Sequence, residues 1–200
     1  GRREARRRHR RSPQTRRSVL TMTAAGPGGG RFCFVNRWRK KDEFPHRTRL
    51  MVSDLAGREL RDVLDSCLIS HFDWWDDDHI LAWAEIGGRR GFYLVDVRTG
   101  AVEPGGAGLQ KADGHTSYSP DRRRILLDAY PRDGYRCLKI YDIAVERETT
   151  LGRYYSDPRI TKDIRCDLHP KWSRTGGRVC FDSIHEGYRR VYVTTLPAGG

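Results

Sequence analysis

Three histidines recur in this chain at one fixed offset. His71, His115 and His169 each stand three residues before an aromatic residue and ten before a short apolar run. The aromatic residues are Trp74, Tyr118 and Trp172, and the apolar runs begin at Leu81, Ile125 and Val179. Self-similarity at a period of roughly 40 to 50 residues is typical of repeat architectures. A repeat places equivalent residues at equivalent positions, so histidines that are distant in sequence can share one face.

Each repeat is predicted to hold four short β-strands. The third repeat is the clearest, with Ser119-Pro-Asp121 as a turn after its first strand. Its strands are expected at 115–118, 124–130, 136–142 and 148–151. Helical periodicity is nearly absent. The segment 55–68 could be taken for a helix, but the repeat predicts a strand over Arg58–Leu64 within it.

Four antiparallel strands per repeat and about four repeats predict an all-β fold, a β-propeller of about four recognisable blades. A β-sandwich is the alternative, although it does not require the same offsets in each unit. The blades are expected at about 18–66, 67–106, 113–156 and 165–197, within a propeller region of 18–200. The chain begins without Met and stops within the fourth blade, so we expect a fragment and an incomplete ring.

The N-terminal segment, residues 1–17, carries nine arginines against the single acidic residue Glu4, in a chain of net charge +12. We expect a disordered arm. Nucleic-acid binding through phosphates is the disfavoured alternative. Arg16-Arg17 resembles a twin-arginine export signal, but the apolar stretch behind it is short, so cytoplasm and periplasm both stay open. No run of 18 apolar residues occurs, and no membrane span is expected.

The Ser119-Pro-Asp121 turn and Trp172-Ser173 resemble the WD40-like repeats of TolB-type propellers. The stretches 113–121, 163–173 and 179–187 resemble more specifically the oligogalacturonate lyases, over roughly residues 70–196. In that family a Gln-x-x-His-Pro-His-Pro segment holds a divalent metal, usually manganese. Here His169-Pro170 matches the last His-Pro, while Asp167 replaces the preceding histidine and Ile164 replaces the glutamine. The resemblance implies a manganese site built on His169 and Asp167.

Alternating strand directions place the start of a blade's first strand at the same end as the loop between its second and third strands. We therefore expect one functional face, with His169, Asp167 and His71 as metal ligands and with His115, Arg132 and His185 as catalytic residues. A uronate β-elimination needs this combination. Metal and arginine neutralise the substrate carboxylate and acidify the C5 proton, and a neutral histidine removes that proton.

A structural role is the alternative for each histidine, since a residue repeated at blade starts can tie neighbouring blades together by hydrogen bonds. That role is preferred for His71, both roles stay open for His115, and the ligand role is preferred for His169 with Asp167. Two functions follow. One is a lyase-like propeller acting on short acidic oligosaccharides from pectin. The other is a non-catalytic propeller that serves as a scaffold for a protein partner.

Overall fold

The computed structural model describes residues 17–39, 47–66, 68–161 and 164–196, and these form antiparallel β-sheets. The first two sheets consist of β1 (Arg17–Ala25), β2 (Arg31–Arg39), β3 (Arg47–Asp54) and β4 (Arg61–Ser66), and of β5 (Ile69–Trp74), β6 (His79–Ile86), β7 (Arg89–Asp96) and β8 (Val102–Pro104). The third consists of β9 (Thr116–Tyr118), β10 (Arg124–Leu127), β11 (Tyr135–Asp142) and β12 (Arg147–Tyr155). The fourth consists of β13 (Lys171–Trp172), β14 (Arg178–Ser183) and β15 (Arg190–Thr195).

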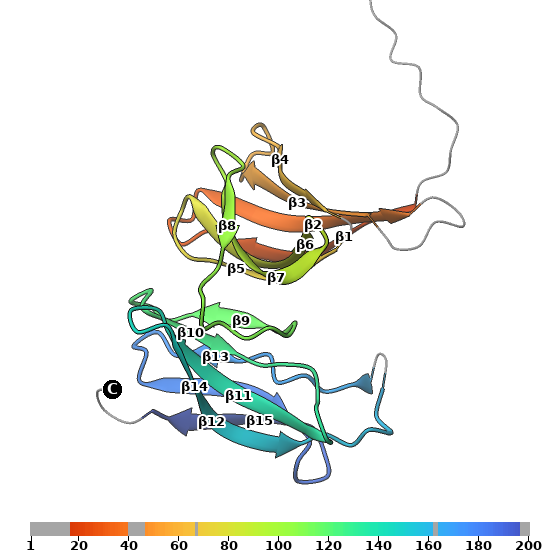
Figure 1. The fold of residues 1–200 in the computed structure, drawn as a ribbon, viewed down its shortest axis with the longest axis vertical. Helices are drawn as coiled ribbons and strands as arrows, with labels where there is room; N and C mark the ends of the chain where they lie inside the picture. The colour runs from red at the N-terminus through yellow and green to blue at the C-terminus, as the bar shows by residue number, and fades with distance from the viewer. Residues whose placement is uncertain (1–16, 40–46, 67, 162–163, 197–200) are drawn as a thin grey trace, which may run out of the picture.

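The four sheets are the blades of a β-propeller, as the sequence predicts. Each sheet pairs its strands in chain order. Within the described ranges, no strand pairs with a strand of another sheet. The first strands of consecutive blades contact one another, β1 with β5, β5 with β9 and β9 with β13 (Figure 1). They are therefore the inner strands, and the start of each repeat lies at the centre of the array.

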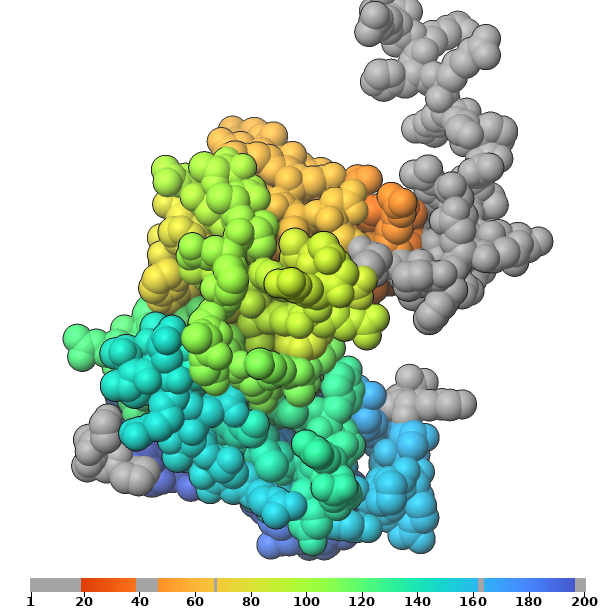
Figure 2. All heavy atoms as spheres, in the orientation of Figure 1, coloured from red at the N-terminus to blue at the C-terminus, as the bar shows by residue number. Residues whose placement is uncertain are grey.

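The apolar core is divided into three clusters, each shared by two consecutive blades. In β10, Ile125 and Leu127 pack against blade 2, whereas Leu126 between them packs against blade 4. This follows from the strand period of two, which sends successive side chains to opposite faces of a sheet. Burying one such leucine stabilises the fold by about 1.5–3 kcal/mol. In the space-filling view, blade 2 in yellow-green lies directly on blade 3 in green and cyan (Figure 2).

The aromatic residue three positions after each histidine belongs to this core. Trp74 is 1% exposed, Tyr118 is also buried and Trp172 is partly buried. Each also contributes a hydrogen bond between blades. The indole Nε1–H of Trp74 donates to the Ala24 carbonyl (3.1 Å), and that of Trp172 to the Ser117 carbonyl (2.8 Å). The backbone N–H of Tyr118 donates to Asp73 (2.8 Å), so neighbouring inner strands are joined at all three interfaces.

The strand predicted over Arg58–Leu64 begins later, at Arg61, because a turn occupies the first residues. The Asp54 carboxylate accepts the backbone N–H groups of Arg58 (2.6 Å) and Glu59 (3.3 Å). Gly57 has φ +70°, which favours glycine. Residues 1–16 of the Arg-rich arm, including Arg16 of the twin-arginine motif, lie outside the described residues. Among the residues described, no helix is long and apolar enough to cross a membrane.

Candidate functional site

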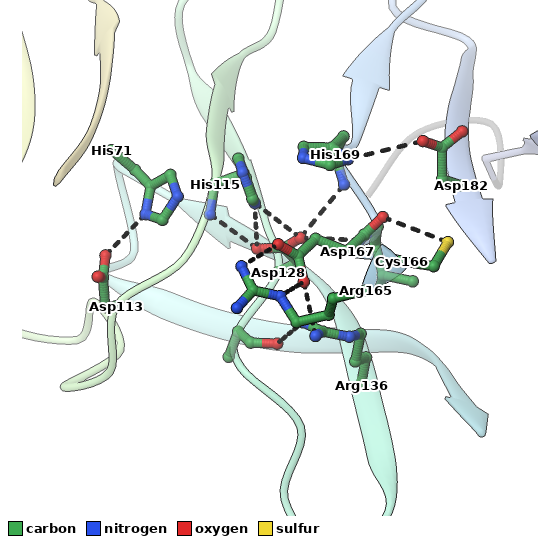
Figure 3. Close-up of polar contacts among 12 residues, drawn as sticks. His71, Asp113, His115, Asp128, Arg136, Arg165, Cys166, Asp167, His169 and Asp182 are labelled. Carbon is green, nitrogen blue, oxygen red and sulfur yellow. Dashed lines mark hydrogen bonds and ion pairs between the residues drawn. The ribbon is translucent and has the colours of Figure 1, made fainter. Parts of the chain in front are cut away.

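The three repeated histidines converge on the inner strands of blades 2, 3 and 4. The ring centroids of His71 and His115 are 4.0 Å apart, and those of His115 and His169 are 4.2 Å apart. His71 lies in β5, His115 directly precedes β9, and His169 stands two residues before β13. Figure 3 shows the three imidazoles side by side in a row. The repeat therefore brings together residues that are 98 positions apart in the sequence, His71 and His169.

Asp128, directly after β10, holds the backbones of His115 and His169 in place by hydrogen bonds. Its carboxylate is 1% exposed and accepts the backbone N–H groups of His115 (2.7 Å), Leu168 (3.2 Å) and His169 (3.2 Å). Burial alone would raise the pKa of Asp128, but the hydrogen bonds and positive charge of His115 hold that pKa below its ordinary value. The charged carboxylate can only accept, so His115 Nδ1 (3.1 Å) donates to it. In the neutral form of the imidazole, Nε2 of His115 then keeps its lone pair.

His71 is held in the same way by a second carboxylate. Its Nδ1 lies 2.8 Å from Oδ1 of Asp113, and the hydroxyl of Ser70 donates to the same oxygen (2.7 Å). Because a carboxylate accepts hydrogen bonds, Nδ1 of His71 carries the proton and Nε2 is free to accept one. An imidazole oriented by a carboxylate in this way is suited to general-base chemistry.

Asp167 lies in the segment that enters blade 4 and is bound by two arginines. Arg165 donates to both carboxylate oxygens (2.7 Å each), and Nη2 of Arg136 is 2.6 Å from Oδ1 (Figure 3). Burial would raise the pKa of Asp167, but these two guanidinium groups lower it below the ordinary value. The site therefore holds a buried carboxylate that stays ionised.

His169 is the most exposed member of the row and has a strained backbone. Its φ is +44°, a conformation that residues with a side chain seldom adopt and that costs about 1–3 kcal/mol. Burial and the neighbouring His115 lower the pKa of His169. The imidazole is therefore neutral near pH 7, which is the form that binds metal.

His115, Asp167 and His169 form a group that fits one metal ion. Each offers one ligand atom, and the three atoms lie within 4.8 Å of one another. Imidazole nitrogen with carboxylate oxygen suits ions such as Zn, Fe or Mn. Arginines occupy both carboxylate oxygens of Asp167, so an ion can bind there only if one guanidinium group moves away. Arg165 is the partner that can leave, since its side chain is 36% exposed and that of Arg136 only 2%.

The remaining predicted residues are not members of this three-residue group. His71 borders the group, but its described bond is to Asp113. Arg132 is exposed in the loop between β10 and β11 and pairs through its backbone with Tyr135. His185 packs between Tyr154 and Tyr192, with Nδ1 2.8 Å from the Ser183 hydroxyl. The contacts described for Arg132 and His185 include none with the three candidate ligands. Their catalytic roles stay predictions.

Asp128 has a repeat signal that the histidine offset alone does not use. It stands thirteen residues after His115, as Asp182 stands thirteen after His169. Arg136 and Arg165 are site residues that were not predicted from the sequence. Tyr130 is another: the guanidinium carbon of Arg165 lies 4.9 Å from its ring centroid, and the ring is 6.4 Å from that of His71. Tyr130 is half-exposed, so it forms an aromatic rim beside the histidines.

Beside the histidine row lies a cavity of about 160 Å³ among the inner strands of all four blades. It is lined by Met22, Thr23, Ala24, His71, Phe72, Asp73, His115, Thr116, His169 and Lys171. The histidines form one side of this cavity. A site with imidazoles at a central opening of the propeller is therefore part of the described fold.

Blade order, inner strands and central cavity define the class of this protein, a β-propeller. Among solved structures its neighbours include TolB propellers. TolB from Acinetobacter baumannii matches with a TM-score of 0.57 and 17% identity over 92% of this chain and 56% of that one. A protein assigned to TolB from Agrobacterium tumefaciens matches with a TM-score of 0.58 and 16% identity over 92% and 59%. The chain thus spans little more than half the length of the TolB structures.

An oligogalacturonate lyase from Vibrio parahaemolyticus is also among the neighbours, with a TM-score of 0.46 and 12% identity over 86% of this chain and 65% of that one. At 16% and 17% identity, the matches to the TolB structures establish the fold alone. No protein-family model matches the sequence, and no curated protein matches it.

Proposed function

We propose that this propeller carries a lyase-like site that binds a divalent cation and cleaves short uronate oligosaccharides of the pectin type by β-elimination. The observation that carries the proposal is the convergence of His115, Asp167 and His169 around one point beside the central cavity. Blade packing alone does not need three ligand atoms within 4.8 Å of one another. Residues that only tie blades together would need a single hydrogen bond each.

The metal would be held by Nε2 of His115, by His169 and by Asp167, with manganese as the expected ion. When bound, such a cation acts as a Lewis acid that polarises the uronate carboxylate. Asp167 would give up Arg165 in that state. The freed guanidinium, next to the ring of Tyr130, is then available to grip the same carboxylate in bidentate fashion. Arg165 therefore takes the role predicted for Arg132.

His71 is the base that the geometry favours. Asp113 fixes its Nδ1–H, so Nε2 can take the C5 proton of the uronate. The electron pair of that C–H bond forms the C4–C5 double bond while the C4–O bond breaks, and the leaving oxygen takes a proton from water. The roles of His71 and His115 are thus exchanged relative to the sequence-based expectation.

The test is a metal analysis and an activity assay on the whole chain. We expect about one divalent ion per chain, and an unsaturated product from digalacturonate whose ultraviolet absorbance rises with time. His169→Ala should abolish both, and His71→Gln should abolish turnover while leaving metal bound. His79→Gln is the matched control, since this histidine of β6 contacts Asp76 (2.9 Å) and is not one of the three candidate ligands. A protein without stoichiometric metal, in which His169→Ala changes only stability, would exclude the lyase.

A second candidate function is a non-catalytic scaffold that binds a protein partner. Two observations favour it: the TolB structures match this fold with TM-scores of 0.57 and 0.58, and the apolar side chains of Val191 and Val193 on β15 are exposed. The scaffold predicts that Val191→Ser with Val193→Ser releases a partner while metal content is unchanged. The lyase predicts full turnover in the same double variant.

A further inference from the structure

Two neighbouring histidines of the row are each bound at Nδ1 by a different carboxylate. Nδ1 of His71 donates to Asp113 (2.8 Å), in the segment between blades 2 and 3. His115, two residues later, donates to Asp128 of blade 3 through both its backbone N–H (2.7 Å) and its Nδ1 (3.1 Å). In the neutral forms of both imidazoles, Nε2 is therefore the nitrogen that can bind a ligand or a proton.

Gly114 allows this segment to lie directly against Asp128. A Cβ atom at position 114 would overlap the backbone carbonyl oxygen of Asp128 and would lie 3.0 Å from its Oδ1. The same carbonyl oxygen accepts a hydrogen bond from the side-chain amide of Gln110 (2.7 Å). Only a residue without a Cβ lets the backbone before His115 come this close. The chain around Asp128 and His115 therefore fixes the position of one relative to the other.

The carboxylate of Asp128 reaches two candidate metal ligands in two blades. Its Oδ1 accepts the backbone N–H of His115, and its Oδ2 accepts the backbone N–H groups of Leu168 (3.2 Å) and His169 (3.2 Å). The backbone of His169 has φ +44°, and a strained conformation persists only where surrounding contacts hold it. One buried side chain thus connects the ligand of blade 3 with the ligand of blade 4 (Figure 3).

The residue thirteen positions after each repeated histidine supports a role for this carboxylate in metal binding. It is Asp128 after His115, Asp182 after His169 and Ala84 after His71. The first two histidines belong to the candidate metal group, and each has its carboxylate near Nδ1, at 3.1 Å and 3.6 Å. The third histidine is not a member of the group, and its carboxylate comes from the segment between the blades.

From these observations we infer that Asp128 is the positioning residue of the metal group. It fixes the proton of His115 on Nδ1 and holds the backbone of His169, so that a nitrogen of each imidazole can face the same point as Asp167. Carboxylates that orient ligand histidines typically change metal affinity by about 10-fold to 100-fold. The part of the inference that concerns metal rests on the proposed function, whereas the tautomer of His115 does not.

Asp128→Asn distinguishes this role from simple packing, because it keeps the shape of the side chain and removes one acceptor. An amide has a single oxygen, so it cannot accept the backbone N–H groups of both His115 and His169. Its NH₂ group can instead donate to Nδ1 of His115, which favours the tautomer with the proton on Nε2. Nε2 then has no lone pair for a metal ion.

NMR of the histidine nitrogens and titration calorimetry with Mn²⁺, both on the full chain, test the inference. In the metal-free wild type at about pH 8, where an ordinary histidine is neutral, we expect the proton of His115 on Nδ1. In Asp128→Asn we expect that proton on Nε2 and an affinity for Mn²⁺ lower by about 10-fold to 100-fold. Signals of His115 are assigned by their absence from His115→Gln.

Asp76→Asn is the matched control. Asp76 accepts the backbone N–H of His79 (2.8 Å) and its Nδ1 (2.9 Å), the same arrangement at a histidine outside the candidate metal group. This variant should change the tautomer of His79 and leave Mn²⁺ affinity unchanged. Asp113→Asn should likewise change the tautomer of His71 without weakening Mn²⁺ binding.

A wild type that carries the proton of His115 on Nε2 would overturn the inference, whether or not the variant folds. Unfolding curves establish that Asp128→Asn is folded at the temperature of the titration. A folded Asp128→Asn that binds Mn²⁺ as tightly as wild type would also overturn it. An equal loss of affinity in Asp76→Asn would have the same meaning, because that carboxylate touches no candidate ligand.

The inference and the proposed function fail separately. The expected tautomers with Asp128-dependent Mn²⁺ binding, but without any unsaturated product from digalacturonate, would exclude the lyase and keep the role of Asp128. Normal turnover and normal Mn²⁺ affinity in Asp128→Asn would keep the lyase and exclude that role.

Discussion

Arg136 and Asp167 form a buried ion pair in which Nη2 and Oδ1 are 2.6 Å apart and the side chains are only 2% and 8% exposed. The pair joins β11 of blade 3 to the segment that enters blade 4. Arg136 also donates to the carbonyl of Ala129 (3.3 Å) and to the hydroxyl of Ser156 (3.3 Å). The candidate ligand Asp167 is therefore fixed by the structure before any metal binds.

Removing Arg136 should destabilise the protein. Arg136→Met leaves the Asp167 carboxylate with one arginine instead of two, and breaking a buried pair typically costs about 3–5 kcal/mol of the free energy of unfolding. Denaturant unfolding measures the change. Arg159→Met, which removes an exposed arginine paired with Asp157, is the control and should change nothing measurable. A loss for Arg136→Met no larger than that of the control would show that the pair does not stabilise the fold.

Removing Arg165 should strengthen metal binding. Arg165 occupies both oxygens of Asp167, so a cation has to displace it. Without the competing positive charge, Arg165→Gln should bind Mn²⁺ about tenfold more tightly, as measured by titration calorimetry. Arg189→Gln, which removes an arginine from the nearby Asp182 instead, is the matched control. Equal affinities in wild type and Arg165→Gln would show that Asp167 is not a ligand.

Stability should fall at acid pH through Asp128. The lowered pKa of this carboxyl in the folded state means that its contribution is fully present above the unfolded value of about 3.9 and is lost as the pH falls through the folded-state value. Asp128→Asn should therefore be less stable than wild type at pH 7, and the difference should shrink below about pH 4. Unfolding midpoints across this range measure it.

Asp73 provides a control of opposite sign. Burial raises the pKa of Asp73, so its charged form is disfavoured in the folded state. The stability that this carboxyl contributes is present at low pH and is lost as the pH rises through the folded-state pKa. Relative to Asp73→Asn, wild type should therefore lose stability as the pH rises above about 3.9, on the opposite side of that pH from the change expected for Asp128. Parallel curves for the two variants would contradict both assignments.

The hydrogen bond from Trp172 should contribute to blade attachment. Trp172→Phe keeps an aromatic ring but removes the Nε1–H donor and leaves the Ser117 carbonyl without it, which should cost about 1–2 kcal/mol. Chemical denaturation measures the loss. Trp38→Phe is the control, since Trp38 lies under the guanidinium of Arg49 (4.5 Å) within blade 1. An equal loss in both variants would mean that the ring, and not the bond, is responsible.

The sequence predicts the propeller and the meeting of the three histidines because both depend on the repeat. An offset of three residues from His71 to Trp74 recurs in every clear unit, and equivalent positions in a propeller lie around one axis. The prediction that these imidazoles share a face is consistent with centroid distances of 4.0 and 4.2 Å. That prediction depends only on the fact that all blades have the same geometry.

The carboxylates beside the histidines follow the same repeat, although the histidine offset alone does not reveal them. Asp128 stands thirteen residues after His115, as Asp182 stands thirteen after His169, and each carboxylate contacts its histidine. What the repeat does not indicate is that blade 4 covers Asp128 and buries it. Arg136 and Arg165 belong to different segments, and nothing in their spacing indicates that both reach Asp167. Conversely, His185 lies in a loop of the expected kind, but its ring packs between two tyrosines.

The division of the apolar core into three clusters, each shared by two blades, has a consequence for folding. No blade has a complete apolar core of its own, so the stability of each blade depends on its contacts with the neighbouring blade. Damage at one boundary should then uncouple the halves on either side rather than melt the molecule all at once. The histidine row crosses two such boundaries, so its geometry would report the separation of the blades at either of them.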